Sequence, residues 1–446
     1  MAHVGLNELD TQAKQLLEQY SNAQLKVKDR LAIPPQQMPA QDPNERRTNM
    51  EEVAQGYTEA QVRVEALRCL QCKNAPCIAG CPVGINIPLF IQKAAEGDFK
   101  GSVDVIKESS MLPAICGRVC PQESQCQLPC TVGKSLKSID NAVNIGRIER
   151  YVADWESHTN SRTNPSIAPP TGRKVGVVGS GPASMTAAAD LRRAGHDVVM
   201  FEALHKAGGV LVYGIPEFRL PKRIVQEELD ALKAMGVHIE HNFLVGRTAK
   251  LHDLMEREGF DALFLGTGAG LPKFLNIEGE NLIGVFSANE YLTRSNLMRA
   301  YERNVAGTPL YGSHKVAVFG GGNVAMDAAR TALRLGAEEV TIVYRRTDEE
   351  MPARREEIAH AKEEGVKFLY LHAPLKIVGD EHGRAKQVQL ITCELGEPDD
   401  SGRRSPVEIP GTEAFHDFDT IIVAIGNASN PLIERTTKGL DVNRRG

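Results

Sequence analysis

The chain has 446 residues, of which 42% are hydrophobic and 24% are charged, and its formal net charge is -5. This length predicts two or three domains, and the weakly acidic balance gives no electrostatic reason to expect nucleic acid or an anionic membrane as a partner. The amino-terminal residues lack a basic segment leading into an apolar one, and no apolar run reaches about 18 residues, so we expect no secretory signal, no membrane span and a cytoplasmic location.

Residues 1–55 are polar and include the proline-bearing stretch IPPQQMPAQDPNERR. This composition predicts an amino-terminal arm without a core of its own. Thr58 and Gln61 form a capping-box pattern, which predicts that a helix begins at Thr58 and leads through Leu70 towards the first cysteines. Short helices punctuated by proline and glycine follow, and we assign residues 56–165 to one helical domain.

Eight of the nine cysteines lie between Cys69 and Cys130, in two groups with the spacings Cys-x2-Cys-x4-Cys-x3-Cys-Pro and Cys-x3-Cys-Pro-x4-Cys-x3-Cys. A secreted disulfide scaffold is disfavoured in a long chain without an export signal. Structural zinc generally uses two tight cysteine pairs, and only the first pair has that form. Dense cysteine runs closed by Cys-Pro are typical of four-iron clusters, so the spacing favours two [4Fe-4S] clusters over zinc.

A carboxylate follows the second cysteine group. Glu149 falls on the apolar stripe that begins at Ile145 in the helical pattern of residues 140–155. A carboxylate on an apolar face needs a charged partner or a metal. From the residues alone, an ion pair with Arg147 or Arg150 is favoured over metal ligation.

After a linker at residues 158–173, strand and helix patterns alternate, which predicts parallel sheets. The stretch KVGVVGSGPASMTAAADLRRAGHDVVMFE (174–202) and the stretch KVAVFGGGNVAMDAARTALRLGAEEVTIVYRR (315–346) share one plan of strand, glycine turn, helix and strand. The later strands FDALFLGTGA and FDTIIVAIGN extend the similarity. The sequence therefore predicts an α/β fold in which two Rossmann-like dinucleotide-binding domains follow the helical double-cluster domain.

In the first turn, Gly179 allows a tight bend, and Gly181 lets backbone N–H groups approach a pyrophosphate at a helix N-terminus. Ser184 stands where the fingerprint has glycine or alanine, and its small size still suits close packing between helix and strand. Glu202 ends the second strand and is placed to accept hydrogen bonds from a ribose. The residues allow either FAD or NAD here.

In the second turn, Gly320 and Gly322 fit the same fingerprint, but the second strand ends in Arg345 and Arg346 instead of an acid. Arginine pairs with a 2′-phosphate that an acid would repel, so this half favours NADP over NAD. The arginines at 354–355 adjoin two glutamates in a helical pattern, and we expect solvent-exposed ion pairs there.

Several of these stretches resemble a known family. CGRVCPQE, GSGPA, YGIPEFRLPK (213–222), GGGNVAMDAAR and VYRR are similar to the small subunit of NADPH-dependent glutamate synthase and to the amino-terminal part of dihydropyrimidine dehydrogenase. EALRCLQCK (65–73) and GAGLPKFLNIEGENLIGVFSANEYLTRSNLM (268–298) more narrowly resemble the large subunit of NADH-dependent reduced ferredoxin:NADP⁺ oxidoreductases.

The resemblance implies a ligand set for each cluster and leaves Cys116 as a free buried thiol. One [4Fe-4S] cluster is expected to take Cys69, Cys72, Cys77 and Cys130. The other is expected to take Cys81, Cys120, Cys126 and, through the similarity of NIGRIER, Glu149. A ligand role would also account for the carboxylate on an apolar stripe.

The resemblance also implies that the first glycine turn binds FAD and the second binds NADPH. For FAD, the expected residues are Gly179, Gly181, Pro182, Ala183, Glu202, Gly208, Gly209, Arg219 and Gly268. For NADPH, they are Gly320, Gly322, Asn323, Val324, Arg345 and Arg346. Hydride is expected to pass from the nicotinamide to the flavin, and single electrons to leave through the clusters. No acid–base residue is nominated.

The implied domains are an arm (1–55), a helical cluster domain (56–165), an FAD domain (170–300, resumed at 426–446) and an NADPH domain (301–425). Relatives continue with a GD-bearing segment over the flavin, whereas this chain stops at GLDVNRRG, so we expect a truncated FAD domain, either because the sequence is a fragment or because its site is open.

The resemblance implies the electron-input (small) subunit of glutamate synthase, working with a large subunit. The alternative is the large subunit of an electron-bifurcating NADH-dependent ferredoxin:NADP⁺ oxidoreductase, with a smaller flavin/iron-sulfur subunit and with ferredoxin as a further candidate partner. A third hypothesis is a non-catalytic electron-transfer or scaffold protein.

Overall fold

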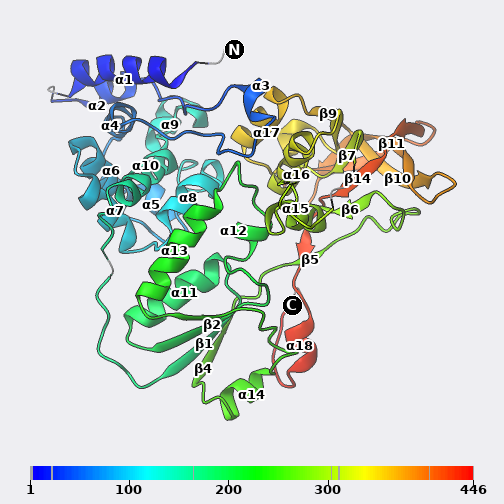
Figure 1. Ribbon diagram of the computed structural model, residues 1–446. Helices are drawn as coiled ribbons and strands as arrows, with labels where there is room; N and C mark the ends of the chain where they lie inside the picture. Colours follow the sequence, from blue (N-terminus) through cyan, green and yellow to red (C-terminus); the bar gives the residue numbers. More distant parts are fainter. Residues whose placement is uncertain are drawn as a thin grey trace.

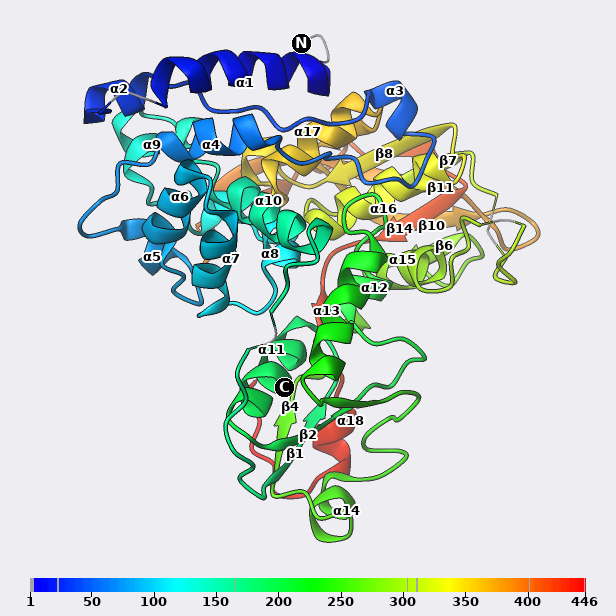
Figure 2. The same cartoon turned by 60° about the vertical axis from the view of Figure 1, so that its left-hand side comes forward.

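The computed structural model describes residues 4–21, 24–163, 165–302, 304–309, 312–400, 402–444 and 446. Two views show a helical part that carries the amino-terminal arm, and two α/β units beside and below it (Figures 1 and 2). Of the helices in these residues, none combines the length and the hydropathy that a membrane crossing requires.

The amino-terminal arm is helical and lies across the helical domain (Figure 2). Its helices are α1 (Leu6–Tyr20), α2 (Val27–Ala32) and α3 (Pro43–Arg46). The buried side chains of α1 are Leu9 and Ala13, and this helix packs on α4 (Glu59–Leu67). The arm therefore contributes apolar side chains to a shared interface.

The helical domain begins where the capping box predicts. Thr58 Oγ1 accepts from the Gln61 N–H at 3.3 Å, and the Thr58 N–H donates to Gln61 Oε1 at 3.1 Å. The further helices are α5 (Pro76–Gly80), α6 (Ile87–Glu96), α7 (Phe99–Lys107), α8 (Pro113–Val119), α9 (Thr131–Ser135) and α10 (Ile145–His158), with short 3-10 helices η1 (Gln122–Ser124) and η2 (Ile139–Asn141). One apolar core joins α4, α6, α7 and α10.

The first α/β unit has a parallel sheet in the order β3-β2-β1-β4. Its strands are β1 (Lys174–Val178), β2 (Asp197–Phe201), β3 (His238–Glu240) and β4 (Ala262–Leu265). Its helices are α11 (Pro182–Arg193), α12 (Val210–Tyr213), α13 (Lys222–Ala234) and α14 (Leu251–Glu256). The strand, turn, helix and strand predicted for residues 174–202 are therefore confirmed.

The second α/β unit repeats this plan with the parallel sheet order β6-β14-β7-β8-β9. Its strands are β6 (Val285–Ser287), β7 (Lys315–Phe319), β8 (Glu339–Tyr344), β9 (Lys367–Tyr370) and β14 (Thr420–Val423). Its helices are α15 (Ala288–Asn296), α16 (Asn323–Arg334) and α17 (Arg355–Glu363), with the 3-10 helix η3 (Asp348–Glu350). Because β6 pairs with β14, this unit draws in residues that precede the expected boundary at residue 300.

An antiparallel sheet covers one side of the second unit. It consists of β10 (His372–Gly379), β11 (Ala385–Pro398), β12 (Arg404–Glu408) and β13 (Ala414–Asp417), with β11 in the middle. The short strands β5 (Leu271–Pro272) and β15 (Asn427–Ala428) pair where the chain crosses between the two units. The segment with α18 (Leu432–Thr436) then returns to the first unit, where Ile433 joins a core with Phe201.

A buried ionic cluster joins the arm to the second unit. Arg46 of α3 and Arg330 of α16 both bind the carboxylate of Glu364, at 2.9 and 2.8 Å, and all three side chains are at most 1% exposed. Arg334 adds a third ion pair to Glu364 at 2.7 Å. Arg330 and Arg334 also stack on the ring of Phe218, in the loop before α13. The cluster therefore links the arm and α16 directly to the Glu364 carboxylate, and links the loop before α13 to it through the two arginines.

The arginines at 354–355 behave differently from each other. Arg354 is 8% exposed, and its guanidinium donates to the Arg118 carbonyl at 2.8 Å and lies 3.4 Å from the Glu123 carboxylate. The prediction of a solvent-exposed pair is therefore wrong for Arg354, because the helical domain covers it. Arg355 is exposed and pairs with Asp140 at 3.2 Å.

We predict that Glu364→Gln lowers the free energy of unfolding by ~3–5 kcal/mol, because it removes the carboxylate shared by Arg46, Arg330 and Arg334 and leaves Arg334 without a counter-charge among the described residues. Glu363→Gln is the matched control: Glu363 also pairs with Arg46, but its side chain is 51% exposed, so its loss should be at most ~1 kcal/mol. Urea titrations of both variants measure the difference, and equal losses would contradict the assigned role.

The same cluster predicts a pH dependence. Burial acts to raise the pKa of Glu364, but the guanidinium groups of Arg330 and Arg334 outweigh it and hold that pKa well below its usual range. The stabilisation is therefore complete above the unfolded-state pKa of about 4.3 and is lost as the pH falls below it. Urea midpoints should fall between about pH 5 and pH 3, with a shallower fall in Glu364→Gln.

Candidate functional site

Cys69, Cys72, Cys77 and Cys130 line one cavity, whose other walls are apolar residues from α6 and from the start of α10. Burial, with neighbouring thiols adding to it, raises the pKa of Cys69 to about 11 and that of Cys77 to about 12. Four thiolates so close together need a compensating positive charge. The donor set fits an iron-sulfur cluster, because iron supplies that charge and prefers thiolate ligands.

The second predicted ligand group converges on Glu149. Burial first, and then the Cys120 thiolate, raises the pKa of Glu149 well above its usual range. Burial also raises the pKa of Cys126, with Glu149, Cys81 and Cys120 adding to the shift. These four side chains are therefore electrostatic neighbours, although they come from separate parts of the chain.

The surroundings of Glu149 favour one of its two interpretations. Its side chain is 7% exposed, and Oε1 is buried without a hydrogen-bond partner among the described residues. Arg147 pairs instead with Glu356 at 3.3 Å, and Arg150 with Glu52 at 3.0 Å. An orphaned carboxylate oxygen facing cysteines fits a ligand position, so the arrangement supports the proposal that Glu149 completes the second cluster.

Two glycines allow this convergence. A Cβ on Gly117 of α8 would lie 2.6 Å from the Arg150 nitrogen of α10, and one on Gly146 would lie 1.7 Å from the Gln122 amide. Helices α8 and α10 thus touch backbone to backbone, which brings Glu149 against the second cysteine group. Cys116 is half-buried beside Cys120.

No three histidine, cysteine, aspartate or glutamate side chains within the described residues are placed to hold a single metal ion. All nine cysteines are free thiols in the structure. A four-iron cluster differs from a single ion because its ligands bind separate corners of a cube.

The first glycine turn leads from β1 into α11. Gly179 has φ +99°, and a Cβ there would lie 2.4 Å from the Gly266 carbonyl oxygen. Gly181 precedes Pro182 and Ala183 at the start of α11, and no atom would lie within 4 Å of a Cβ there. The N–H groups of this helix start are therefore open to an anionic group.

Glu202 is held by neighbouring residues. Its Oε1 accepts from the Leu204 N–H at 2.7 Å, and Oε2 accepts from the Ser180 hydroxyl. Ser180 Oγ in turn accepts from the Gly208 N–H at 2.8 Å. Each carboxylate oxygen keeps further lone pairs for a ribose hydroxyl. The sequence does not predict that Ser180 holds Glu202. The only signal for such a role is a hydroxyl-bearing residue within the glycine fingerprint.

The remaining residues expected at FAD lie in two places. A Cβ on Gly209 would lie 2.8 Å from the Gly181 Cα, so this glycine packs directly on the first turn, and Gly268 has φ +69° in the loop after β4. Arg219 is buried and pairs with Asp327 of α16 at 2.6 Å and with Glu357 of α17 at 3.4 Å. Its guanidinium is thus committed to the second unit, and its role at FAD stays a prediction.

The second glycine turn opens on a cleft of about 1570 Å³ including its open mouth. Gly320, Gly322, Asn323 and Val324 lie along it, with the carboxyl ends of the parallel strands β7 and β8 close by. Gly320 has φ +143°, and a Cβ there would lie 2.4 Å from the Ala424 carbonyl oxygen. A phosphate can therefore approach the start of α16.

Arg345 and Arg346 both line this cleft but differ in exposure. Arg345 is exposed. Arg346 is 3% exposed and pairs with Asp399 at 2.6 Å. The sequence pattern predicts the same role for both arginines, because the hairpin that covers Arg346 lies far away in the chain.

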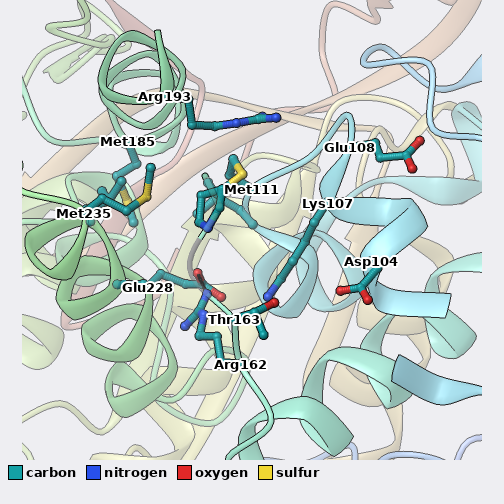
Figure 3. A pocket seen from close by; sticks show the side chains of 14 residues that line it. Asp104, Lys107, Glu108, Met111, Arg162, Thr163, Met185, Arg193, Glu228 and Met235 are labelled. Carbon is teal, nitrogen blue, oxygen red and sulfur yellow. Dashed lines mark hydrogen bonds and ion pairs between the residues drawn. The ribbon is translucent and has the colours of Figure 1, made fainter. Parts of the chain in front are cut away.

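A further cleft lies between α7, α11 and α13, and the linker after α10 forms one of its walls (Figure 3). Met111, Met185 and Met235 form its apolar side, and Arg162 pairs with Glu228 across it. None of its lining residues belongs to the predicted sites.

Comparisons with known proteins agree with this arrangement. A family model described as dihydropyrimidine dehydrogenase domain II, 4Fe-4S cluster, matches residues 46–161, and one described as pyridine nucleotide-disulphide oxidoreductase matches residues 173–446. The Mycobacterium tuberculosis oxidoreductase FprA in complex with NADPH superposes with a TM-score of 0.50 at 22% identity, over 62% of this chain and 74% of that one. This likeness shows the fold alone.

Closer relatives carry functional names. The glutamate synthase [NADPH] small chain of Halomonas elongata is 35% identical over 396 residues, or 89% of this chain and 82% of that one. The glutamate synthase [NADPH] small chain of Escherichia coli is 36% identical over 384 residues, or 85% and 80%. The NADPH-Fe(3+) oxidoreductase subunit beta of Geobacter sulfurreducens is 36% identical over 83% of this chain and 53% of its own length. The predicted fold and the predicted cofactors, which are 4Fe-4S clusters, FAD and NADPH, are confirmed.

We predict that Glu149→Ala changes the EPR signal of one reduced cluster and leaves the other unchanged, because only one cluster would lose a ligand. Glu156→Ala is the matched control, since Glu156 lies on the same helix and also has a buried oxygen without a partner. EPR of the reduced protein measures both variants, and two unaltered signals in Glu149→Ala would remove Glu149 from the ligand set.

Proposed function

Because this chain belongs to the family of the small chains of NADPH-dependent glutamate synthase, we propose that it oxidises NADPH and supplies electrons to a partner subunit that forms glutamate. The chain is an oxidoreductase with NADPH-linked electron transfer. The finer assignment, to glutamate synthesis, is the proposal.

The chain's own residues divide the work between three sites. The start of α16, with Arg345 at the mouth of the cleft, is proposed to hold NADPH, and the start of α11, with Glu202, is proposed to hold FAD. The two cysteine groups are proposed to hold the clusters. When bound, FAD can accept two electrons and release them one at a time, and the clusters carry single electrons. The protein supplies position, charge and exclusion of water.

The observation that carries the proposal is a core shared by the second cysteine group and the first unit. Leu112 and Ile115 of the α8 segment are buried in one cluster with Val177 of β1, Met185 of α11 and Leu229 of α13. Helix α8, which leads into Cys120, is thus packed into the unit that contains the first glycine turn. Electron transfer between cofactors needs a fixed separation, and a shared core fixes the position of α8 relative to β1 and α11.

The names of the relatives support a partner. They are small chains or beta subunits, and neither matching family model describes glutamine hydrolysis. We therefore assign glutamate formation to a large subunit. The alternative is a bifurcating oxidoreductase with a smaller flavin/iron-sulfur subunit, and what favours it is the narrower resemblance of residues 65–73 and 268–298 to that group.

The test is to purify the tagged chain with its native partner and to assay the complex anaerobically. For a glutamate synthase, we predict that NADPH oxidation requires glutamine and 2-oxoglutarate together, and that glutamate accumulates. The chain alone should still reduce ferricyanide with NADPH, because that activity needs no partner. A complex that instead requires ferredoxin and NAD⁺ together would establish the alternative, and one that responds to neither pair would contradict both.

A further inference from the structure

A turn between β11 and β12 brings a third arginine to the nucleotide cleft. Arg403 lines the cleft together with Arg345 and Arg346, although it comes from the antiparallel sheet and not from the glycine fingerprint. Glu408 of β12 lines the same cleft and is exposed. Among the residues that line the cleft, arginines therefore outnumber carboxylates.

The guanidinium of Arg346 already binds two partners within the protein. Its Nη2 lies 2.6 Å from Asp399 Oδ2, and its Nε donates to the Arg404 carbonyl oxygen at 2.5 Å. The guanidinium thus binds the turn on both sides of Arg403. With 3% exposure and its charge compensated by Asp399, this side chain is poorly placed to serve as the main phosphate ligand.

Asp399 shapes the turn from inside. Its N–H donates to the Arg403 carbonyl oxygen at 2.7 Å, and its Oδ1 accepts from the Arg403 N–H at 3.4 Å. The pair of Arg346 and Asp399 therefore fixes the backbone from which Arg403 extends. A rearranged turn would move Arg403 relative to Arg345.

We propose that Arg403 and Arg345 together bind the 2′-phosphate of NADPH, and that Arg346 and Asp399 are positioning residues that hold Arg403 at the cleft. The proposal rests on the assignment of this cleft to NADPH, not on glutamate synthesis. Two arginines match the two charges of a phosphate monoester, and they offer donors in a fork that fits its oxygens. The 2′-hydroxyl of NADH gives them no charge to bind.

The probes are 2′,5′-ADP, which carries the 2′-phosphate, and 5′-AMP, which lacks it. Isothermal titration of the purified chain measures both without any turnover, so the result does not depend on the final electron acceptor. Arg403→Ala should weaken the binding of 2′,5′-ADP by about ten-fold or more, as expected for the loss of one charge-assisted contact. The affinity for 5′-AMP should stay within about two-fold of the parent. Arg403→Lys should lose less because it keeps the charge.

Arg404→Ala is the matched control. Its side chain bonds the Leu395 carbonyl outside the cleft lining, and alanine keeps the backbone carbonyl that Arg346 uses. Both affinities should stay within about two-fold of the parent. If Arg403→Ala also leaves the affinity for 2′,5′-ADP unchanged, the proposal for Arg403 is wrong.

Asp399→Asn separates a positioning role of Arg346 from direct binding. If Arg346 holds the turn, this variant weakens the binding of 2′,5′-ADP, because Arg403 is displaced, and leaves the affinity for 5′-AMP unchanged. If Arg346 were the phosphate ligand, releasing it from Asp399 would instead tighten the binding of 2′,5′-ADP. Tighter or unchanged binding of 2′,5′-ADP overturns the positioning role.

Discussion

The buried carboxylate of Glu364 is the constraint on which the arrangement of the domains depends. A charge at 0% exposure is stable only if its partners arrive with it, and those partners are Arg46 of the arm and Arg330 and Arg334 of α16. Phe218, on which Arg330 and Arg334 stack, brings in the loop of the first unit. The positions of the arm, the first unit and the second unit therefore depend on one another.

The second constraint is the close contact of α8 with α10. Gly117 leaves no room for a side chain, so α8 meets the backbone of α10 directly, and Gly146 of α10 packs against the Gln122 side chain of η1. That contact turns Glu149 towards the second cysteine group, while Leu112 and Ile115 fix the same region in the core of the first unit. One short segment thus links the proposed cluster ligands to the unit with the proposed flavin site.

The two α/β units show how a repeated plan takes on different chemistry. Both begin with a strand, a glycine turn and a helix, and both have a fixed group where the second strand ends. In the first unit that group is Glu202, held by Ser180 and Leu204. In the second it is Arg346, held by Asp399 of an antiparallel hairpin that has no counterpart in the described part of the first unit. The difference lies in what covers the strand end.

The sequence by itself determined the features that depend on local geometry: the capping box at Thr58, the glycine turns, the order of strands and helices within each repeat, and the cysteine spacings that indicate iron-sulfur clusters. Such features involve residues only a few positions apart, so their pattern is visible in the chain. Only the tertiary structure decided that Glu149 has no arginine partner among the described residues, that Arg354 is buried, and that Arg346 bonds a turn while Arg403 reaches the cleft. Those facts depend on contacts between distant segments, and a charged residue in a sequence does not reveal which distant partner will neutralise it.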